Sequence, residues 1–292
     1  MMARSFQRRP WRNVPKLNQW MSTVDGKISL GAMSIPGTHQ SASRFDGLSF
    51  GWVRCQTETL EWQLLNGIRY LDFRLYLRQN PLTTKPGPFE FYHGHVYQQL
   101  VFNSALTACV KFLDANPSET IIMRLSPSNP LSKEEQTSWA EGLHRLVTDV
   151  PRERIFFGTN IPSLDAARGK IITLSDPYIA VGFQYRRNDH IVIQDLWEKP
   201  SLETKFTAIK YFIDFVSEHT KRLYLNHLSA SGTPWWYASR LNLRTDNFIQ
   251  QLSLDDRLGV IIFDYAGASR GRWRAKETYL IKDIIDRNSY ID

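Results

Sequence analysis

Ser34–Ser41 has the sequence SIPGTHQS, in which a short apolar run of β-strand type ends in polar residues. Two later segments share this arrangement, IRYLDFRLYL at Ile68–Leu77 and FYHGH at Phe91–His95. Along the whole chain, short β-rich runs alternate with segments whose apolar residues have helical spacing. Such alternation implies parallel strands that are joined by right-handed crossovers. We therefore expect an α/β fold.

The alternation predicts individual elements. The expected strands are Ala32–Ile35, Ile68–Leu75, Glu90–His93, Thr120–Leu125, Arg154–Phe157, Lys170–Leu174, Ile191–Gln194, Arg222–Asn226 and Val260–Asp264. The expected helices are Gln56–Leu65, Val101–Ala115, Lys133–Val147, Ser201–Thr220, Tyr237–Leu252 and Lys276–Arg287, and Lys85–Pro88 is expected to form a turn. About eight strand–helix units in roughly 250 residues fit a single, irregular (β/α)8 barrel of the TIM type. A doubly wound open sheet is the alternative, but no glycine-rich phosphate loop follows the first expected strand.

Ionisable residues lie at or just past the C-terminal ends of the expected strands, where barrel enzymes have their active sites. These residues are His39, Arg74, His93, Asp195 and Asp264. Two histidines and an arginine form a minimal set for cleaving a phosphodiester. One imidazole removes a proton, the other supplies one, and the guanidinium stabilises charge on the phosphate oxygens. Asp72 and Arg74 have the same side-chain parity on one strand, so both should point into the barrel.

Eight segments of the chain, taken in order, resemble the X domain of phosphatidylinositol-specific phospholipase C, and most closely that of the small bacterial enzymes. They are SIPGTH, GIRYLDFR, YHG, DANPSETIIM, DAARGKIITL, IVIQD, YLNHLSASGTPWWYAS and VIIFDY. Their shared order makes chance a poor explanation. The resemblance extends from about Trp20 to the C-terminus. It implies one catalytic barrel over residues 19–292, after a basic and disordered leader at residues 1–18.

The resemblance implies a role for each residue of the histidine–arginine set. His39 is the expected general base, which takes the proton from the inositol 2-hydroxyl, and Asp264 is its orienting partner. His93 is the expected general acid, which protonates the departing glycerol oxygen. Arg74 is the expected phosphate clamp, and Asp72 supports the cluster. The expected products are diacylglycerol and an inositol cyclic phosphate, from phosphatidylinositol or from a glycosylphosphatidylinositol anchor.

The same resemblance predicts headgroup contacts and reveals two departures. Arg168 and Asp195 are expected to hydrogen-bond inositol hydroxyls, and Trp197 is expected to stack on the sugar ring. Gln40 stands where the bacterial enzymes have an aspartate that works with the general acid. Ser126 stands at a substrate-side position where they have a lysine. An amide cannot favour the protonated histidine as a carboxylate does, so Gln40 leaves the strength of the acid open.

Arg74 also predicts that the enzyme needs no metal or other cofactor. In calcium-dependent relatives the corresponding position carries an acidic metal ligand, and a guanidinium would take the cation's place. No His/Cys cluster with zinc spacing appears in the sequence. Two alternatives remain open. One is a glycerophosphodiester phosphodiesterase, which needs a carboxylate-rich metal site. The other is a non-catalytic barrel that binds inositol phosphate or membranes, because Gln40 has replaced the carboxylate.

The charge of the chain favours an anionic partner. Its 292 residues carry a formal net charge of +7. No long Lys/Arg run or nucleic-acid-binding motif occurs, so an anionic membrane surface is the expected partner and nucleic acid is not. No apolar stretch approaches the length of a membrane span. Cys55 and Cys109 form no disulfide framework, and we expect a monomer.

Tryptophans are expected at a membrane-facing rim. Trp52, Trp235 and Trp236 fall in segments where the bacterial relatives expose aromatic residues, and indole rings suit the headgroup zone of a bilayer. Packing in the core is the alternative for each of them. The basic N-terminus has no apolar region of the kind found in signal peptides, so a cytoplasmic or peripheral membrane location is expected rather than secretion.

Overall fold

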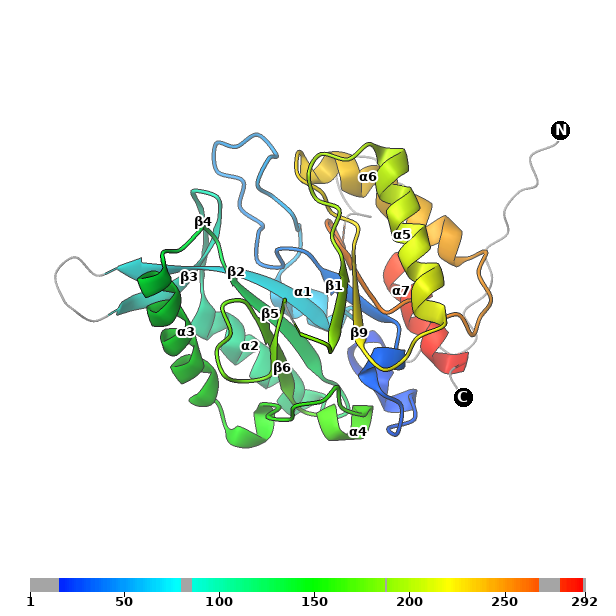
Figure 1. Cartoon of the computed structure of the whole chain (residues 1–292), viewed down its shortest axis with the longest axis horizontal. Coiled ribbons are helices and arrows are strands. Elements are labelled where there is room, and N and C mark those ends of the chain that lie inside the picture. The colour runs from blue at the N-terminus through cyan, green and yellow to red at the C-terminus, as the bar shows by residue number, and fades with distance from the viewer. Residues whose placement is uncertain (1–15, 80–85, 187, 268–278, 291–292) are drawn as a thin grey trace.

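The computed structural model of the chain describes residues 16–79, 86–186, 188–267 and 279–290. Eight parallel strands form a curved sheet (Figure 1). Their order is β7 (Phe183–Gln184), β6 (Ile171–Ser175), β5 (Ile121–Pro127), β2 (Tyr70–Gln79), β1 (Ile35–Thr38), β10 (Val260–Phe263), β9 (Leu223–His227) and β8 (Ile191–Gln194). In the described residues no pairing joins β7 to β8, so the barrel is open there. The predicted irregular (β/α)8 barrel is confirmed.

Helices cover the outside of the sheet unevenly. Figure 1 shows α2 and α3 on one side and α5, α6 and α7 on the other. The α-helices are α1 (Leu60–Leu65), α2 (Phe102–Ala115), α3 (Lys133–Thr148), α4 (Leu164–Ala167), α5 (Leu202–Ser217), α6 (Pro234–Ile249) and α7 (Leu280–Asp286). The 3-10 helices are η1 (Leu17–Thr23), η2 (Leu30–Ala32), η3 (Arg152–Arg154) and η4 (Arg287–Tyr290). The N-caps of α3, α4 and α5 are Ser132, Ser163 and Ser201. Each serine hydroxyl accepts a hydrogen bond from a backbone N–H of the first helical turn. None of the described helices is long and apolar enough to span a bilayer.

An antiparallel hairpin extends one edge of the barrel mouth. β3 (Pro86–His93) pairs antiparallel with the long strand β2, and β4 (Val96–Val101) pairs with β3. With Phe91 opposite Leu75, the returning strand brings His93 back towards the mouth of the barrel. The strand predicted at Glu90–His93 is therefore real, but it is part of this hairpin rather than of the barrel wall.

Other elements differ from their predicted positions. The first strand begins at Ile35 rather than Ala32, so that it ends directly before His39. Gly37 lies inside this strand, where a Cβ atom would be 2.8 Å from the Cβ of Tyr70, so β1 can pack closely on β2. The strand expected at Arg154–Phe157 is wrong, because only Ile155 forms an isolated bridge there.

Some expected elements lie partly outside the described residues. The turn expected at Lys85–Pro88 is instead the start of β3 from Pro86 onwards, and residue 85 lies outside the described part of the chain. Residues 1–15 of the expected leader also lie outside it, whereas Leu17 begins η1. Residues 276–278 of the last expected helix are likewise not described, and α7 begins at Leu280.

The barrel interior changes from apolar to ionisable towards the C-terminal ends of its strands. On β2, Tyr70 belongs to a buried apolar cluster, whereas Asp72 two positions later is a buried carboxylate. On β5, Ile122 belongs to the same cluster and is followed by the buried Arg124. Because alternate residues of a strand face the same side, an apolar layer supports a charged layer at the mouth. This layer positions the candidate site.

Candidate active site

His39 and Asp264 form a buried pair at the ends of adjacent strands. His39 follows β1, Asp264 follows β10, and the Nδ1 atom of His39 lies 2.9 Å from a carboxylate oxygen of Asp264. Both side chains are almost completely buried. Gln56 fixes the backbone here, because its amide donates to the carbonyl oxygens of His39 and Phe263. A carboxylate at Nδ1 selects the tautomer whose Nε2 is unprotonated, and Nε2 has no hydrogen-bond partner. His39 is thus arranged to accept a proton.

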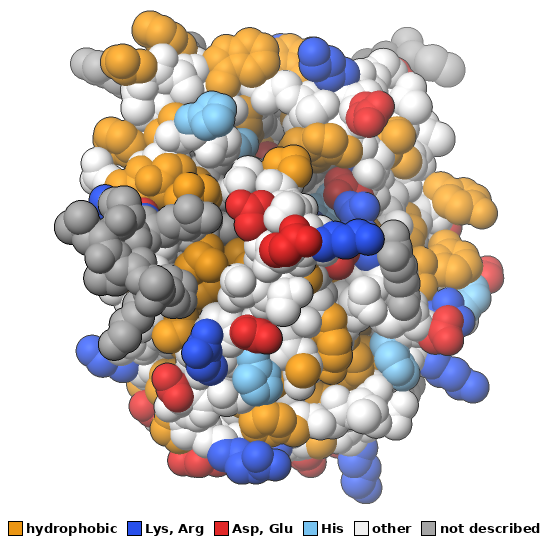
Figure 2. Space-filling view, turned by 60° about the vertical axis from the view of Figure 1, so that its left-hand side comes forward, with side chains coloured by type: hydrophobic (Ala, Val, Ile, Leu, Met, Phe, Trp, Pro, Cys, Tyr) orange, Lys and Arg blue, Asp and Glu red, His pale blue; other side chains and the backbone are white. Residues whose placement is uncertain are grey.

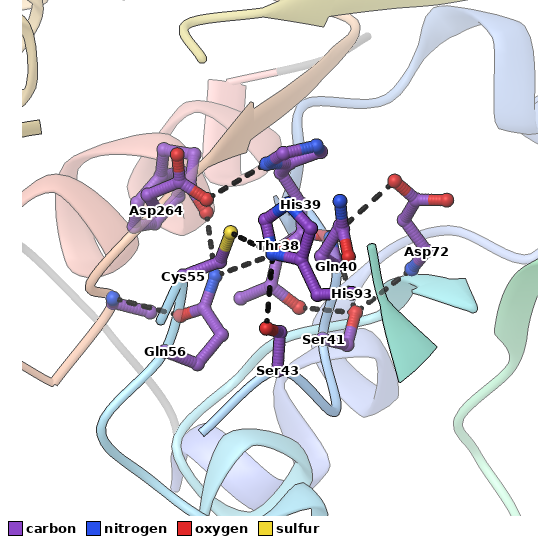
Figure 3. A network of polar contacts seen from close by, with 12 residues as sticks. Thr38, His39, Gln40, Ser41, Ser43, Cys55, Gln56, Asp72, His93 and Asp264 are labelled. Atoms are coloured by element: carbon purple, nitrogen blue, oxygen red, sulfur yellow. Dashed lines mark hydrogen bonds and ion pairs between the residues drawn. The ribbon is translucent and has the colours of Figure 1, made fainter. Parts of the chain in front are cut away.

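His93 belongs to the same network (Figure 3). Its Nδ1 atom lies 2.6 Å from the carbonyl oxygen of Val53 and 3.7 Å from the thiol of Cys55. A carbonyl oxygen can only accept a hydrogen bond, so Nδ1 carries a proton and donates it. Burial, and after it the neighbouring His39 side chain, lower the pKa of His93 to about 4. The ring is therefore neutral at pH 7 in the free protein, with Nδ1 protonated and Nε2 left for another partner.

Asp72 and Arg74 form an ion pair inside the mouth. The Nε atom of Arg74 donates to one carboxylate oxygen at 3.0 Å, and Nη2 donates to the other at 3.2 Å. Burial would raise the pKa of Asp72, but the guanidinium groups of Arg124 and Arg74 outweigh it and hold that pKa far below its usual value. Asp72 also accepts a hydrogen bond from the backbone N–H of Gln40, whose φ is +41°. The carboxylate therefore fixes both the guanidinium and the loop after His39.

A cavity of about 570 Å³ opens at this end of the barrel. Its lining residues are His39, Gln40, Arg74, Arg124, Arg186, Asp195, Leu196, Trp197, Glu198 and His227. The Trp197 ring centroid lies 5.5 Å from that of His39 in an edge-to-face arrangement, so the indole forms one wall beside the imidazole. One carboxylate oxygen of Asp195 is buried and has no hydrogen-bond partner. Burial raises the pKa of Asp195, but the neighbouring His227 and Lys205 side chains outweigh it and lower that pKa.

Several residues of the site were not predicted from the sequence, among them Arg124, Tyr185 and His227. The guanidinium of Arg124 lies 3.9 Å above the ring of Tyr185, whose hydroxyl lies 3.1 Å from Nε2 of His227. Burial lowers the pKa of His227 to about 3, so its ring is neutral. Arg124 has the same parity on its strand as Ser126, and His227 ends the apolar run YLNH. Those two signals could have identified Arg124 and His227.

The predicted headgroup role of Arg168 is wrong. Its guanidinium donates to the backbone carbonyl oxygens of Met21, Val24 and Ser118 and is paired with Asp165. These neighbours precede their strands, so Arg168 ties together the N-terminal end of the barrel, opposite the cavity. The binding role of Arg168 was inferred only from the resemblance of DAARGKIITL. That resemblance does not indicate at which end of the barrel the arginine lies.

Ser126 lies next to Arg74 in the register of β5 and β2. Its hydroxyl oxygen is buried and has no hydrogen-bond partner. The side chain faces the same way as Arg124, but it is not among the residues that line the cavity. Ser126 therefore faces the barrel interior beside Arg74 without lining the cavity.

One group of described residues could hold a metal ion. His39, Cys55 and Asp264 can bring one ligand atom each to within 4.8 Å of one another. Burial, followed by the carboxylate of Asp264, raises the pKa of the Cys55 thiol well above its usual value. A metal bound by this group would occupy both the histidine and its carboxylate partner. Such an ion would compete with proton transfer by His39.

Large apolar side chains are exposed around the cavity mouth. Trp52 is 58% exposed and Trp236 is 40% exposed, whereas Trp235 is half-buried and packs on Tyr265. The loop after β1 adds Leu48 and Phe50, which are about nine-tenths exposed. Figure 2 shows hydrophobic side chains along the upper edge of the molecule, the edge to which these loops belong in Figure 1. We call Leu48, Phe50, Trp52 and Trp236 the mouth rim.

Comparison with known proteins accounts for this arrangement. Residues 33–176 match the family described as phosphatidylinositol-specific phospholipase C, X domain. A Listeria monocytogenes protein, 1-phosphatidylinositol phosphodiesterase, is 31% identical, over 97% of this chain and 88% of the relative. The chain belongs to the phosphatidylinositol-specific phospholipase C family. The family resemblance stated from the sequence is confirmed.

Solved structures of phosphatidylinositol-specific phospholipases C have the same fold. The Listeria monocytogenes enzyme superposes with a TM-score of 0.76 at 30% identity, covering 94% of this chain and 99% of the other. A mutant of the Staphylococcus aureus enzyme superposes with a TM-score of 0.81, covering 95% and 98%. Its 22% identity supports the fold alone.

Proposed function

We propose that this protein is a phospholipase C that cleaves phosphatidylinositol into diacylglycerol and an inositol cyclic phosphate. The observation that carries the proposal is that His39 and Arg74 line one cavity at the mouth of a family-typical barrel, with His93 in the polar network around His39. The reaction needs a base, an acid and a stabiliser of phosphate charge within a short distance of one another. Glycosylphosphatidylinositol anchors contain the same phosphodiester and fall in the same substrate class.

In the first step, Nε2 of His39 removes the proton of the inositol 2-hydroxyl. The oxygen attacks the neighbouring phosphorus, and Asp264 stabilises the imidazolium that results. Nucleophile and phosphorus belong to one molecule, so orientation is largely provided by the substrate. As the new P–O bond forms, the bond from phosphorus to the glycerol oxygen breaks. The imidazolium form of His93, which its low pKa makes a minor form at pH 7, donates its Nε2 proton to that oxygen. Arg74 binds the phosphate oxygens while their charge grows.

Two predicted contacts support binding of the inositol ring. The Trp197 indole forms a cavity wall next to His39, so it can stack on a sugar ring whose 2-hydroxyl points at the base. The unpaired carboxylate oxygen of Asp195 can accept hydrogen bonds from ring hydroxyls. These contacts leave Arg74 free to bind the phosphate and the two histidines free to transfer protons.

Turnover of phosphatidylinositol in the presence of EDTA tests this function against both alternatives. We expect cleavage to diacylglycerol to persist at its full rate, because Arg74 supplies the cation and no carboxylate-rich cluster occurs among the described residues. A glycerophosphodiester phosphodiesterase would lose activity on chelation and regain it with calcium. A non-catalytic barrel would bind vesicles without releasing diacylglycerol in either condition.

The low pKa of His93 predicts an effect of Gln40→Asp. Gln40 lines the cavity and belongs to the same network as His93 (Figure 3). A carboxylate there favours the imidazolium form and raises the pKa of His93 from about 4. We expect the alkaline limb of the pH profile of kcat/KM for the lipid to move to higher pH, with a faster rate near neutrality.

An aryl inositol phosphate serves as the control for Gln40→Asp. Its activated leaving group needs little protonation, so its pH profile should change much less than that of the lipid. Equal changes with both substrates would show that Gln40 has no part in protonating the leaving group.

We propose that the mouth rim enters the headgroup region of a bilayer. Burying one large apolar side chain contributes about 1.5–3 kcal/mol, which is roughly tenfold or more in affinity. Phe50→Ser and Leu48→Ser should therefore each weaken binding to phosphatidylinositol vesicles by about tenfold, without changing cleavage of a water-soluble inositol phosphodiester. Tyr211→Ser is the matched control, because Tyr211 is exposed on α5 and is not part of the mouth rim. Equal effects of all three changes in a vesicle sedimentation assay would contradict the proposed interface.

A further inference from the structure

Arg124 is a buried cation that the reaction as described above does not use. It lies on β5 opposite Asp72 of β2, with only 4% of its surface exposed, and it lines the cavity beside Arg74 and His39. Arginines are rarely buried this deeply unless their donors are bound. The hydrogen bonds of this guanidinium therefore need to be accounted for.

Protein groups accept hydrogen bonds from only some of the N–H donors of this guanidinium. Its Nη1 atom lies 3.5 Å from a carboxylate oxygen of Asp72, at the upper limit for a hydrogen bond. One face covers the Tyr185 ring at 3.9 Å, and the buried Nε atom has no hydrogen-bond partner. Asp72 is meanwhile bound more closely by Arg74. Donors of Arg124 remain for a ligand in the cavity.

Charge counting leads to the same conclusion. Asp72 and Arg74 together are neutral, because the carboxylate is ionised and contacts two donors of that guanidinium. With Arg124, the group of Asp72, Arg74 and Arg124 carries one positive charge in excess. An anionic phosphodiester would be attracted by this excess charge rather than by the neutral pair alone.

We propose that Arg124 binds a non-bridging phosphate oxygen of the substrate jointly with Arg74, so that the site holds phosphate between two arginines. This rests on the proposed function, because the phosphate is that of the inositol phosphodiester. Arg124 would be a catalytic residue in its own right, since charge on that oxygen grows as the cyclic phosphate forms. The stack on Tyr185 holds the guanidinium plane in place for this contact.

The experiment compares the binding of myo-inositol 1-phosphate with that of myo-inositol. In the full-length protein, Arg124→Ser should weaken binding of the phosphate ester by about 10–10²-fold, as expected for loss of a charge-assisted hydrogen bond, and leave myo-inositol unchanged. Titration calorimetry gives both affinities. For the lipid, kcat should fall by about 10²-fold or more, as when one oxyanion donor is removed. Arg124→Lys keeps the positive charge. It provides a second variant for the same measurements if the Arg124→Ser protein does not fold.

Ser126→Lys, added to Arg124→Ser, tests whether charge in the cavity matters rather than support of Asp72. Ser126 has the same strand parity and an unpartnered hydroxyl, so a lysine there restores a cation beside Arg74. The double variant should regain preference for the phosphate ester. Arg154→Ser, which breaks an arginine pair with Asp114 on a surface away from the cavity, is the matched control and should change neither affinity.

Two results would overturn the proposal. One is that Arg124→Ser weakens the binding of both ligands equally and also lowers the Tm. This result would mean that Arg124 supports Asp72 structurally. The other is a stably folded double variant that binds the phosphate ester no better than the single variant. If the wild-type protein does not cleave phosphatidylinositol, the proposed function fails, but the two ligand affinities still measure what Arg124 binds.

Discussion

His39→Ala and His93→Ala are each expected to lower cleavage of phosphatidylinositol by about 10²–10⁴-fold, the usual loss when a general base or acid is removed. His39 is held by Asp264 and has a free Nε2, whereas His93 is held through Nδ1 by the carbonyl of Val53. Each imidazole therefore presents one nitrogen for proton transfer. Release of diacylglycerol from mixed micelles measures the effect.

The two variants should differ with an activated substrate. An aryl inositol phosphate needs the base but little help from the acid, so His93→Ala should retain much more activity on it than His39→Ala does. His219→Ala is the control, because His219 is stacked on Phe215 at the end of α5 and should leave both activities unchanged. Near-wild-type turnover of the lipid by either active-site variant would exclude its proposed role.

Sequence reasoning succeeded where local pattern and strand parity were sufficient. His39 and Asp264 both directly follow short apolar strands, and parallel pairing of those strands brings their side chains together. Asp72 and Arg74 share one strand, so their common direction followed from parity alone. Such residues are predictable because the barrel places every strand end at the same mouth.

Long-range packing decided the residues that were missed or misplaced. Arg168 lies at the opposite end of the barrel, and nothing in its own segment gives the positions of the carbonyl groups it binds. His93 reaches the site through an antiparallel hairpin, which the alternating pattern did not distinguish from a barrel strand. Leu48 and Phe50 are exposed apolar residues in a loop, whereas the resemblance to the bacterial enzymes indicated only tryptophans as rim residues.

Asp264→Asn is expected to lower kcat for the lipid by on the order of 10⁴-fold, the loss seen when a histidine-orienting aspartate becomes an amide. The carboxylate accepts the Nδ1 proton of His39, which leaves Nε2 free to act as a base. An amide can instead donate to Nδ1, which moves the ring proton to Nε2 and abolishes its capacity to accept one. It also removes the negative charge that stabilises the imidazolium. Cleavage rates measured with the lipid and with the aryl substrate check this.

Asp264→Asn should lower the cleavage rates of both substrates by the same factor. Both substrates need the base to activate the 2-hydroxyl, and a better leaving group does not replace that step. Equal losses with both substrates indicate loss of the base. Loss of the acid would instead strongly lower only the cleavage rate of the lipid. Asp114→Asn serves as the control, since Asp114 is half-exposed and pairs with Arg154 away from the cavity. Thermal unfolding of each variant shows whether the fold is retained. A stable Asp264→Asn protein that keeps its full rate would mean that His39 is not the base. Cys55 and His93 would then be titratable groups of this network to test for that role.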